Sequence, residues 1–244
     1  MSQLFHTLLT EPLLNALVFL YQVVTFKDLG LAIILLTIII RLILYPLFYK
    51  SYRNQTLLQK IQPEVKKIQH DHKHDRERQA QALLALYKQH KVNPFSGFFL
   101  LLIQLPILIA LYKVFFNGFS GDALADLYNF IPAPTEVNNT LLGLIDLAKP
   151  NIIIVGLAAA AQYLQGRLSL SKKTQNQEGS PAERIGKQMV YIGPILTLVI
   201  LYSLPAAVGL YWSMTSIFSV IQQIFINRSL AHYGTAAEPS KKTT

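Results

Sequence analysis

The chain has 244 residues, of which 52% are hydrophobic and only 14% are charged. In a soluble domain about a quarter of all residues are charged. This composition therefore excludes an ordinary soluble protein and favours one that crosses a membrane several times. The net charge of +9 does not indicate sequence-specific nucleic-acid binding, because the basic residues gather between and after apolar runs. The absence of cysteine excludes disulfides and thiolate metal sites.

The first 28 residues form an apolar segment that is not a typical signal peptide. No Lys or Arg precedes Lys27, and Glu11-Pro12 interrupts the apolar pattern. The apolar run 13–26 is short for a membrane span. We therefore expect residues 1–28 to be extracytoplasmic and to include an interfacial amphipathic helix, with a re-entrant or signal-like segment as the alternative.

Five apolar runs follow, and each is a candidate transmembrane helix. The last two are separated by Ser203-Leu204-Pro205, which favours a tight turn because proline ends a helix at the preceding residue. The sequence therefore predicts an all-α polytopic membrane protein, built as a five-transmembrane-helix bundle. Its spans are residues 29–49, 94–117, 151–167, 188–204 and 205–227.

The charges of the connecting segments predict the orientation of these spans. Residues 50–93 carry ten Lys and Arg residues, whereas residues 118–150 have Lys149 as their only basic residue. Positively charged loops belong in the cytosol. We therefore expect the N-terminus outside, residues 118–150 outside, and the C-terminus inside. The cytosolic parts would be residues 50–93, 168–187 and 228–244.

Residues 50–93 are expected to fold as a cytosolic helical hairpin. Apolar residues repeat at helical spacing over 57–68 and again over 80–87, and HDHKHD at 70–75 supplies a polar turn. Pro63 is compatible with this arrangement only if it bends or restarts the first helix. The alternating His and Asp residues of the turn do not share one helical face, so we expect a solvated tip rather than a metal site.

Arg41 lies in the middle of the first predicted span, where a charge costs at least about 2.5–3.5 kcal/mol on insertion scales. Snorkelling to the headgroups is one explanation. Nine residues separate Arg41 from Lys50, or about 13 Å along a helix, which is roughly twice the reach of an extended arginine. Hydration, or a polar partner inside the bundle, is therefore favoured over snorkelling.

No Asp or Glu lies in any predicted span, so Arg41 has no counter-ion there. Neutral polar residues do lie at span depth, and for any single one interhelical hydrogen bonding or interfacial anchoring is sufficient explanation. Together with the unpaired arginine, they predict a partly hydrated polar groove that opens to the cytosol. The set comprises Thr37, Gln104, Gln162, Gln165, Tyr191, Thr197, Tyr211, Trp212, Ser213, Thr215, Ser216, Ser219, Gln222 and Gln223.

Several function classes are disfavoured by the same residues. A proton-coupled carrier normally has an intramembrane Asp, Glu or His relay, and a channel has a ring of charges or carbonyls; neither pattern is present. Hydrolase and nucleotide-binding motifs are also missing from the sequence. We expect no catalytic site, no cofactor and no metal, and thus no enzyme. A groove that transiently receives a polar segment of another polypeptide is favoured, with a small-solute or ion transporter and a non-catalytic subunit of a membrane complex as alternatives.

Several motifs, in the same order, resemble the YidC family of membrane protein insertases. They are LAIILLTIIIRLILYPL (31–47), IQPEVKKIQ (61–69), LYKQHKVNP (86–94), IQLPILIALYKVF (103–115), MVYIGPILT (189–197) and LPAAVGLYWSMTSIFSVIQQ (204–223). The chain departs from the family pattern at 97–100, where GFFL replaces the common G-C-L-P. The resemblance covers nearly all of residues 29–226.

This resemblance implies an energy-independent insertase and chaperone in a bacterial inner membrane. In that family, a groove in the cytosolic leaflet receives the hydrophilic flank of a nascent membrane protein, while the apolar segment slides along lipid-facing helices. By analogy Arg41 would attract acidic substrate tails, and Gln104, Gln162 and Trp212 would line the same groove. The spans 94–117 and 188–204 would form the apolar exit path.

The resemblance also implies partners. Nascent membrane proteins and the lipid bilayer come first, and the cytosolic hairpin would receive substrates or targeting factors. The ribosome and the Sec translocon are further candidates. The tail 228–244 has few basic residues, which argues against strong ribosome binding through it.

Overall fold

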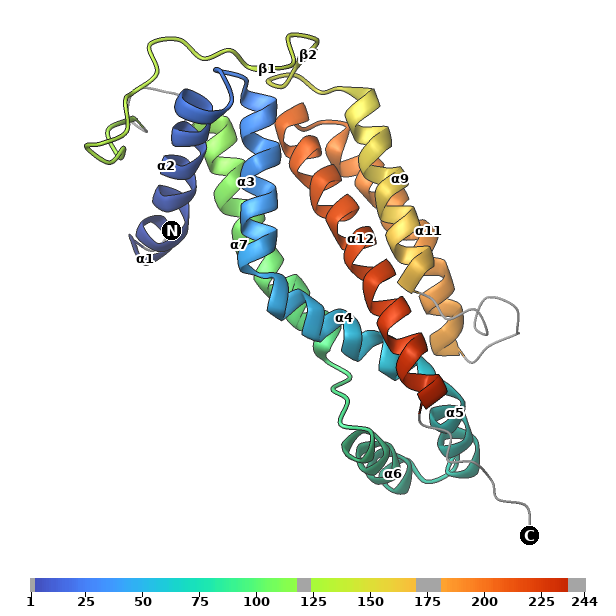
Figure 1. Cartoon of the computed structure of the whole chain (residues 1–244). Helices are drawn as coiled ribbons and strands as arrows, with labels where there is room; N and C mark the ends of the chain where they lie inside the picture. Colours follow the sequence, from blue (N-terminus) through green and yellow to red (C-terminus); the bar gives the residue numbers. More distant parts are fainter. Residues whose placement is uncertain (1–2, 118–123, 170–180, 237–244) are drawn as a thin grey trace.

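The computed structural model describes residues 3–117, 124–169 and 181–236, and these are mostly helical. Long helices run side by side, with a short strand pair at one end and a pair of smaller helices at the other (Figure 1). In chain order the elements are α1 (Gln3–Phe5), the π-helix η1 (His6–Thr10), α2 (Glu11–Phe19), the π-helix η2 (Leu20–Val24), α3 (Leu29–Ile43), α4 (Tyr45–Lys60), α5 (Gln62–Asp71), α6 (Arg76–Gln89), α7 (Ser96–Asn117), β1 (Thr140–Leu141), β2 (Ile145–Asp146), α9 (Ile152–Ser169), α11 (Pro181–Leu201) and α12 (Ala206–Ala236).

The N-terminal helical stretch is longer than the apolar run from which an interfacial helix is predicted. It extends from Gln3 to Val24, 22 residues, and is long and apolar enough to cross a membrane. Pro12 does not end it, because the preceding turn is a π-helix in which the N–H of Glu11 donates to the carbonyl of His6. A π-turn of this kind accommodates a residue that has no N–H to donate.

The first predicted span, residues 29–49, is bent rather than straight. α3 ends at Ile43, and α4 begins at Tyr45 with its axis turned by 68°. The cause lies in Pro46, whose ring has no N–H and clashes with the carbonyl four residues earlier. At the other end Asp28 caps α3, because its carboxylate accepts the N–H of Leu31 at 2.8 Å.

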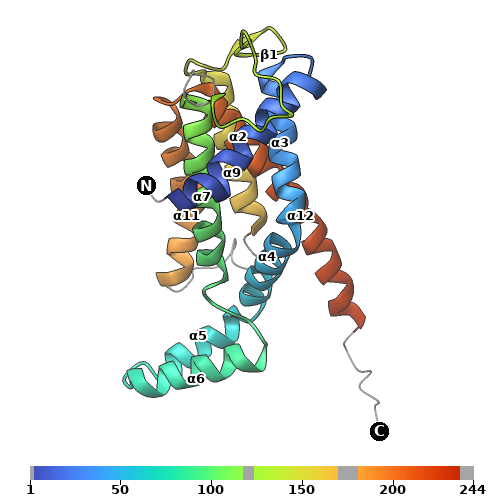
Figure 2. The same cartoon turned by 90° about the vertical axis from the view of Figure 1, so that its left-hand side faces the viewer.

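α12 is the central helix of the bundle. It packs against α3, α4, α7, α9 and α11, and Figure 2 shows it running obliquely through the molecule behind α3. The main core is apolar and joins the N-terminal helices to α3, α7, α9 and α12. Its most deeply buried side chains are Leu17, Val18, Tyr21, Ile33, Leu111, Val114 and Leu147.

α5 and α6 pack against each other at the end of the molecule opposite the strand pair (Figure 2). Their contact is a small apolar cluster of Ile61, Val65, Leu86 and Val92. The helix restarts after Ile61, as the sequence requires of Pro63. Asp75 begins α6, because its carboxylate accepts the N–H of Arg78 at 3.0 Å.

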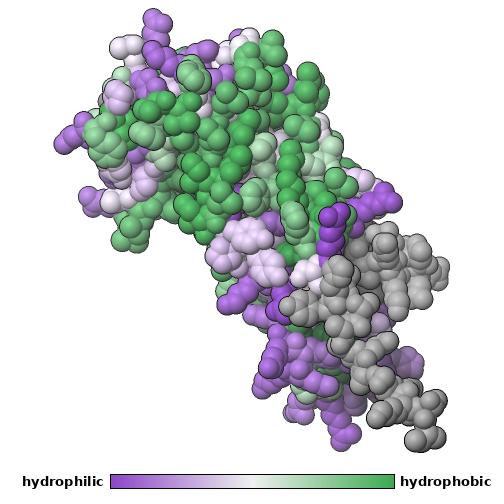
Figure 3. All heavy atoms as spheres, in the orientation of Figure 1, coloured by the Kyte–Doolittle hydropathy of each residue, from purple (hydrophilic) through white to green (hydrophobic). Residues whose placement is uncertain are grey.

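Hydropathy divides the molecular surface into two regions. Apolar residues cover the long helices, and hydrophilic residues dominate around α5 and α6 (Figure 3). Three helical segments could each cross a membrane by length and composition, and a fourth could if the bent pair α3–α4 counts as one span. α11 contains a shorter apolar helix, Val190–Leu201.

Some of the remaining sequence predictions correspond to helices and turns of the structure, and others fall on residues outside its described part. The predicted span 151–167 corresponds to α9, and the predicted turn at 203–205 separates α11 from α12. The predicted cytosolic loop 168–187 falls mostly on residues 170–180, which lie outside the described part of the chain. Residues 237–244 of the predicted tail and 118–123 of the predicted outer loop also lie outside it.

The contact between α3 and β1 makes a prediction for stability. A Cβ atom at Gly30 would lie 2.4 Å from Leu141 Cδ1 and 2.8 Å from its Cα, so Gly30→Ala should destabilise the chain by about 1–3 kcal/mol. Gly156→Ala is the control, because a Cβ there meets nothing within 4 Å and alanine favours a helix. Thermal unfolding in detergent micelles should show a lower Tm for the first variant only. Equal Tm values would contradict the close approach of α3 and β1.

Candidate functional site

A polar cavity of about 300 Å³ lies between α3, α4, α7, α9 and α12. Arg41, Gln104, Gln162 and Trp212, the four groove residues that the family resemblance implies, all line it, although they come from four different helices. The full lining is Arg41, Phe48, Tyr52, Gln55, Gly97, Leu100, Gln104, Gln162, Gln165, Ser169, Trp212, Thr215, Ser216 and Ser219.

Arg41 is directed into this cavity and not toward the surface. Arg41 is only 4% exposed, which argues against snorkelling of its side chain to the surface. The guanidinium carbon lies 4.1 Å from the centroid of the Phe48 ring, a cation–π contact worth about 2 kcal/mol when desolvated. Its Nη1 atom has no hydrogen-bond partner among the described residues. The guanidinium is thus held by a ring and retains free donor capacity.

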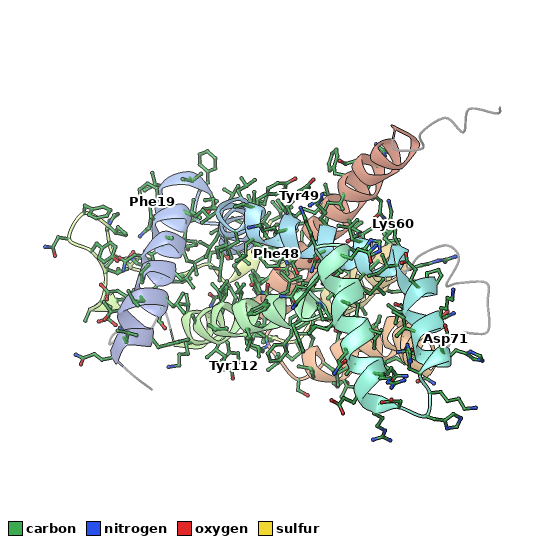
Figure 4. All side chains as sticks on the ribbon, turned by 90° about the horizontal axis from the view of Figure 1, so that it is seen from below. Phe19, Phe48, Tyr49, Lys60, Asp71 and Tyr112 are labelled. Carbon is green, nitrogen blue, oxygen red and sulfur yellow. The ribbon has the colours of Figure 1, made fainter. Side chains whose placement is uncertain are left out.

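The bend at Pro46 helps to create this contact. Arg41 is in the last turn of α3 and Phe48 is in the first turn of α4, on opposite sides of the 68° bend. Viewed from below, Phe48 lies inside the bundle, whereas Phe19 belongs to the peripheral α2 (Figure 4). The bend of the backbone at Pro46 therefore places the Phe48 ring beside Arg41.

Among the residues that the structure describes, no carboxylate lines the cavity. Within the described residues, the ion pairs involve other groups, such as Arg78 with Asp75 at 3.2 Å and Lys149 with Asp146 at 3.0 Å. A buried cation without a counter-ion raises the local potential, because the low-dielectric surroundings screen it poorly. The cavity should therefore attract anionic groups.

Hydrogen bonds between neutral side chains organise one wall of the cavity. Gln162 on α9 accepts from Trp212 Nε1 at 3.2 Å and from the hydroxyl of Thr197 on α11. Gln104 on α7 donates to the hydroxyl of Tyr211 on α12. These contacts link four helices and fix the orientation of the amide groups that face the arginine.

A second set of bonds surrounds Tyr52 on α4. Its hydroxyl donates to Ser219 Oγ at 2.9 Å and accepts from Gln165 Nε2 at 3.3 Å. Thr215 Oγ1 has no hydrogen-bond partner among the described residues, although it is buried. The lining on this side thus reaches from α12 toward α4 and the end of α9.

The cavity is closed at one end. Toward the strand pair, the space between α3, α7 and α12 is filled by apolar side chains that include Leu36, Ile107 and Leu111. Toward α5, the lining continues with Gln55 and Ser169. The polar space therefore extends only part of the way through the bundle.

Not every polar residue at span depth belongs to the cavity. Thr37 bonds within its own helix, to the carbonyl of Ile33 at 2.7 Å, and Tyr191 is 60% exposed beside Tyr163. Gln222 and Gln223 are buried but do not line it. Helix periodicity could not separate these residues from Gln104 and Gln162, because the rotation of each helix depends on its packing.

The sequence-based reasoning missed several lining residues, above all Phe48, Tyr52 and Gln55. It assigned them to the end of the first span or to the hairpin. A signal was available, because these residues follow Arg41 by seven, eleven and fourteen positions, which is the spacing of one helical face.

The chain's single tryptophan, Trp212, provides a test of this geometry. Gln162→Leu removes the acceptor of Trp212 Nε1 and should cost about 1–3 kcal/mol, because a buried donor is left unpaired. Tryptophan emission should move to shorter wavelength as that wall becomes apolar. Gln89→Leu, at an exposed position on α6, is the control and should leave the emission unchanged. An identical spectrum for both variants would contradict the placement of Trp212 beside Gln162.

Similarity to known proteins covers most of the chain. Residues 19–233 match the family model described as 60Kd inner membrane protein. Proteins named membrane protein insertase YidC are similar along 91% of the chain, at 33% identity in Rickettsia bellii and 32% in Rickettsia rickettsii. The chain spans only 39% of the length of these relatives.

Structural similarity agrees with this match. A crystal structure described as an active YidC insertase with the first transmembrane domain resolved aligns with 90% of this chain and 46% of its own, at a TM-score of 0.57 and 25% identity. The likeness is that of a mostly helical fold with several apolar helices. The chain therefore belongs to the 60Kd inner membrane protein family, which is the family of the YidC membrane protein insertases.

Proposed function

We propose that this chain is a membrane protein insertase and chaperone of a bacterial inner membrane. It would receive the hydrophilic segment of a nascent membrane protein in the cavity around Arg41 and release the apolar segment into lipid. The family membership supports the general activity. The single observation that supports the site is a buried guanidinium whose Nη1 is unpaired in a cavity that no described carboxylate lines.

The proposed mechanism needs no nucleotide. A polar segment crossing hydrocarbon loses its hydration, and a polar cavity that reaches into the bundle shortens the distance over which this loss occurs. Arg41 adds attraction for an acidic segment, while its contact with Phe48 keeps the guanidinium in place. Burial of the substrate's own apolar segment then provides the driving force, at about 25 cal/mol per Å².

The proposed exit path lies on the other side of Trp212. An apolar cavity of about 190 Å³ between α7, α11 and α12 is also lined by Trp212, so this side chain forms part of both walls. Apolar side chains of α7 and α11 are exposed, and Ile109 and Ile200 among them line this cavity, which suits contact with lipid or with a substrate helix. They include Leu102, Leu105, Ile109, Ile195, Leu196, Val199 and Ile200.

The proposed topology has five spans, formed by α3 with α4, by α7, α9, α11 and by α12. α12 is too polar to qualify on hydropathy, but Thr215, Ser216 and Ser219 line the cavity, other polar residues such as Gln222 and Gln223 are buried, and α12 packs against five helices. The basic α5–α6 pair would be cytosolic, in agreement with the positive-inside rule. The cavity would then open toward the cytosol, and the N-terminal helix would begin outside, interfacial or inserted.

Nascent membrane proteins and lipid are the partners that this function requires. We propose the α5–α6 pair as the contact site for substrates or targeting factors, because it is exposed and lies beyond the apolar region (Figure 3). The ribosome and the Sec translocon are further candidates that the cavity does not by itself require.

Insertion into liposomes that contain only the purified chain tests the proposal. The substrates are two single-span proteins that differ only in whether the translocated tail carries acidic residues or their amides. Arg41→Ala should reduce insertion of the acidic substrate by about tenfold, because a charge-assisted contact is worth about 1.5–3 kcal/mol, and should affect the neutral one less. Arg41→Met, which keeps most of the side-chain volume, should behave in the same way.

Arg228→Ala is the matched control, because it removes an exposed arginine near the end of α12, outside the cavity and outside the α5–α6 pair. It should insert both substrates normally. Equal losses for both substrates in Arg41→Ala would contradict the attraction of charge. Failure of the unaltered chain to insert either substrate would instead favour a non-catalytic subunit of a larger complex, and solute flux that depends on Arg41 would favour a transporter.

A further inference from the structure

A second recess lies where α4, α6 and the beginning of α7 meet, apart from the cavity around Arg41. It has a volume of about 730 Å³. Its lining is Leu47, Lys50, Ser51, Arg53, Asn54, Leu57, Leu84, Tyr87, Lys88, Lys91, Val92, Asn93, Pro94, Phe95, Ser96 and Phe99. We infer that this recess binds the headgroup of an anionic phospholipid.

The charge of the recess is of one sign. Lys50, Arg53, Lys88 and Lys91 line it, and none of the carboxylates in the described part of the chain does. Other basic groups near the recess differ from these four because they have a carboxylate beside them. Arg78 contacts Asp75, and His90 contacts Glu64. Four cations around one concave surface are suited to a phosphate, which accepts several charge-assisted hydrogen bonds at once.

Ser96 adds an uncharged donor at the same place. It is the first residue of α7 and is 7% exposed, and its Oγ atom has no hydrogen-bond partner among the described residues. The beginning of this 22-residue helix also brings the positive end of the helix dipole to the recess, while the N–H groups of Ser96, Phe98 and Phe99 are bonded to backbone carbonyls. A buried, unpartnered hydroxyl at a helix N-terminus is suited to a bound anion.

The backbone between α6 and α7 holds the two lysines in position. Lys91 has a φ of +52°, which is uncommon for a residue with a side chain, and it is fixed by hydrogen bonds from its N–H to the Lys88 carbonyl and from the Val92 N–H to the Tyr87 carbonyl. This turn ends α6 and brings both Lys88 and Lys91 to the recess. A local conformational cost is thus tolerated where the basic side chains converge.

Apolar side chains border the basic groups and favour a lipid over a free anion. Phe95 is 67% exposed and Phe99 is 53% exposed, and both line the recess together with Leu47 and Leu84. The apolar segment Ser96–Phe115 begins here, so the recess lies at the level where lipid phosphates meet acyl chains. A phospholipid would cover the cations with its phosphate and the aromatic rings with its acyl chains, whereas an acidic peptide or nucleic acid would leave the rings in water.

The test is binding of phosphatidylglycerol to the purified full chain in detergent, followed by native mass spectrometry. Arg53→Gln combined with Lys88→Gln should weaken binding by about 25-fold, because each basic residue near an anionic lipid is worth about fivefold in affinity. Lys67→Gln combined with Lys73→Gln removes the same charge from exposed positions outside the recess and should bind as the unaltered chain does. Lys50→Gln with Lys91→Gln is the second pair if the first lowers stability.

Two further probes separate the lipid from other anions. Phosphatidylcholine should bind weakly to every variant, and glycerol phosphate, which has the headgroup chemistry without acyl chains, should bind much less than the lipid. Phe95→Ser should lower binding of the lipid but leave binding of glycerol phosphate unchanged. Three results would each overturn the inference. They are an equal loss of binding in the recess pair Arg53/Lys88 and the control pair Lys67/Lys73, equal binding of phosphatidylcholine and phosphatidylglycerol, and preference for an acidic peptide or RNA oligonucleotide over the lipid.

Discussion

The arrangement of this bundle depends on one buried cation, the guanidinium of Arg41, which lies against the Phe48 ring in a cavity whose described lining contains no carboxylate. Burying an unpaired charge is costly, so its surroundings must offer polarity in another form. Pro46 bends the chain and places Phe48 beside the charge, while amide and hydroxyl groups from three other helices complete the lining.

The same constraint explains the unusual character of α12. This helix is too polar to qualify as a membrane span by hydropathy, yet it is the most central element of the structure. Its Thr215, Ser216 and Ser219 face the cavity, and the helices around it separate them from lipid. These polar side chains of α12 thus line the interior cavity, whereas apolar side chains of α7 and α11 are exposed. Trp212 lies between the polar cavity and the apolar one.

Much of this protein follows from its sequence. The alternation of apolar runs and basic loops predicts a polytopic helical membrane protein, and the family match agrees. The unpaired Arg41 and the polar residues at span depth predict a groove, the family resemblance selects Gln104, Gln162 and Trp212 among them, and the structure brings all four to one cavity. Their role in binding a substrate stays a prediction. The restart of the helix at Pro63 could also be predicted, because proline removes a donor wherever it occurs.

Other features were decided only by the tertiary structure. Apolar composition alone predicts one span over 29–49, and the size of its bend depends on how α4 packs against α7 and α12. Composition also treats Thr37 and Gln162 alike, although one bonds within its own helix and the other faces the cavity. The physical reason is that periodicity gives the spacing of residues along a helix, whereas the direction in which each face points is set by packing against neighbouring helices.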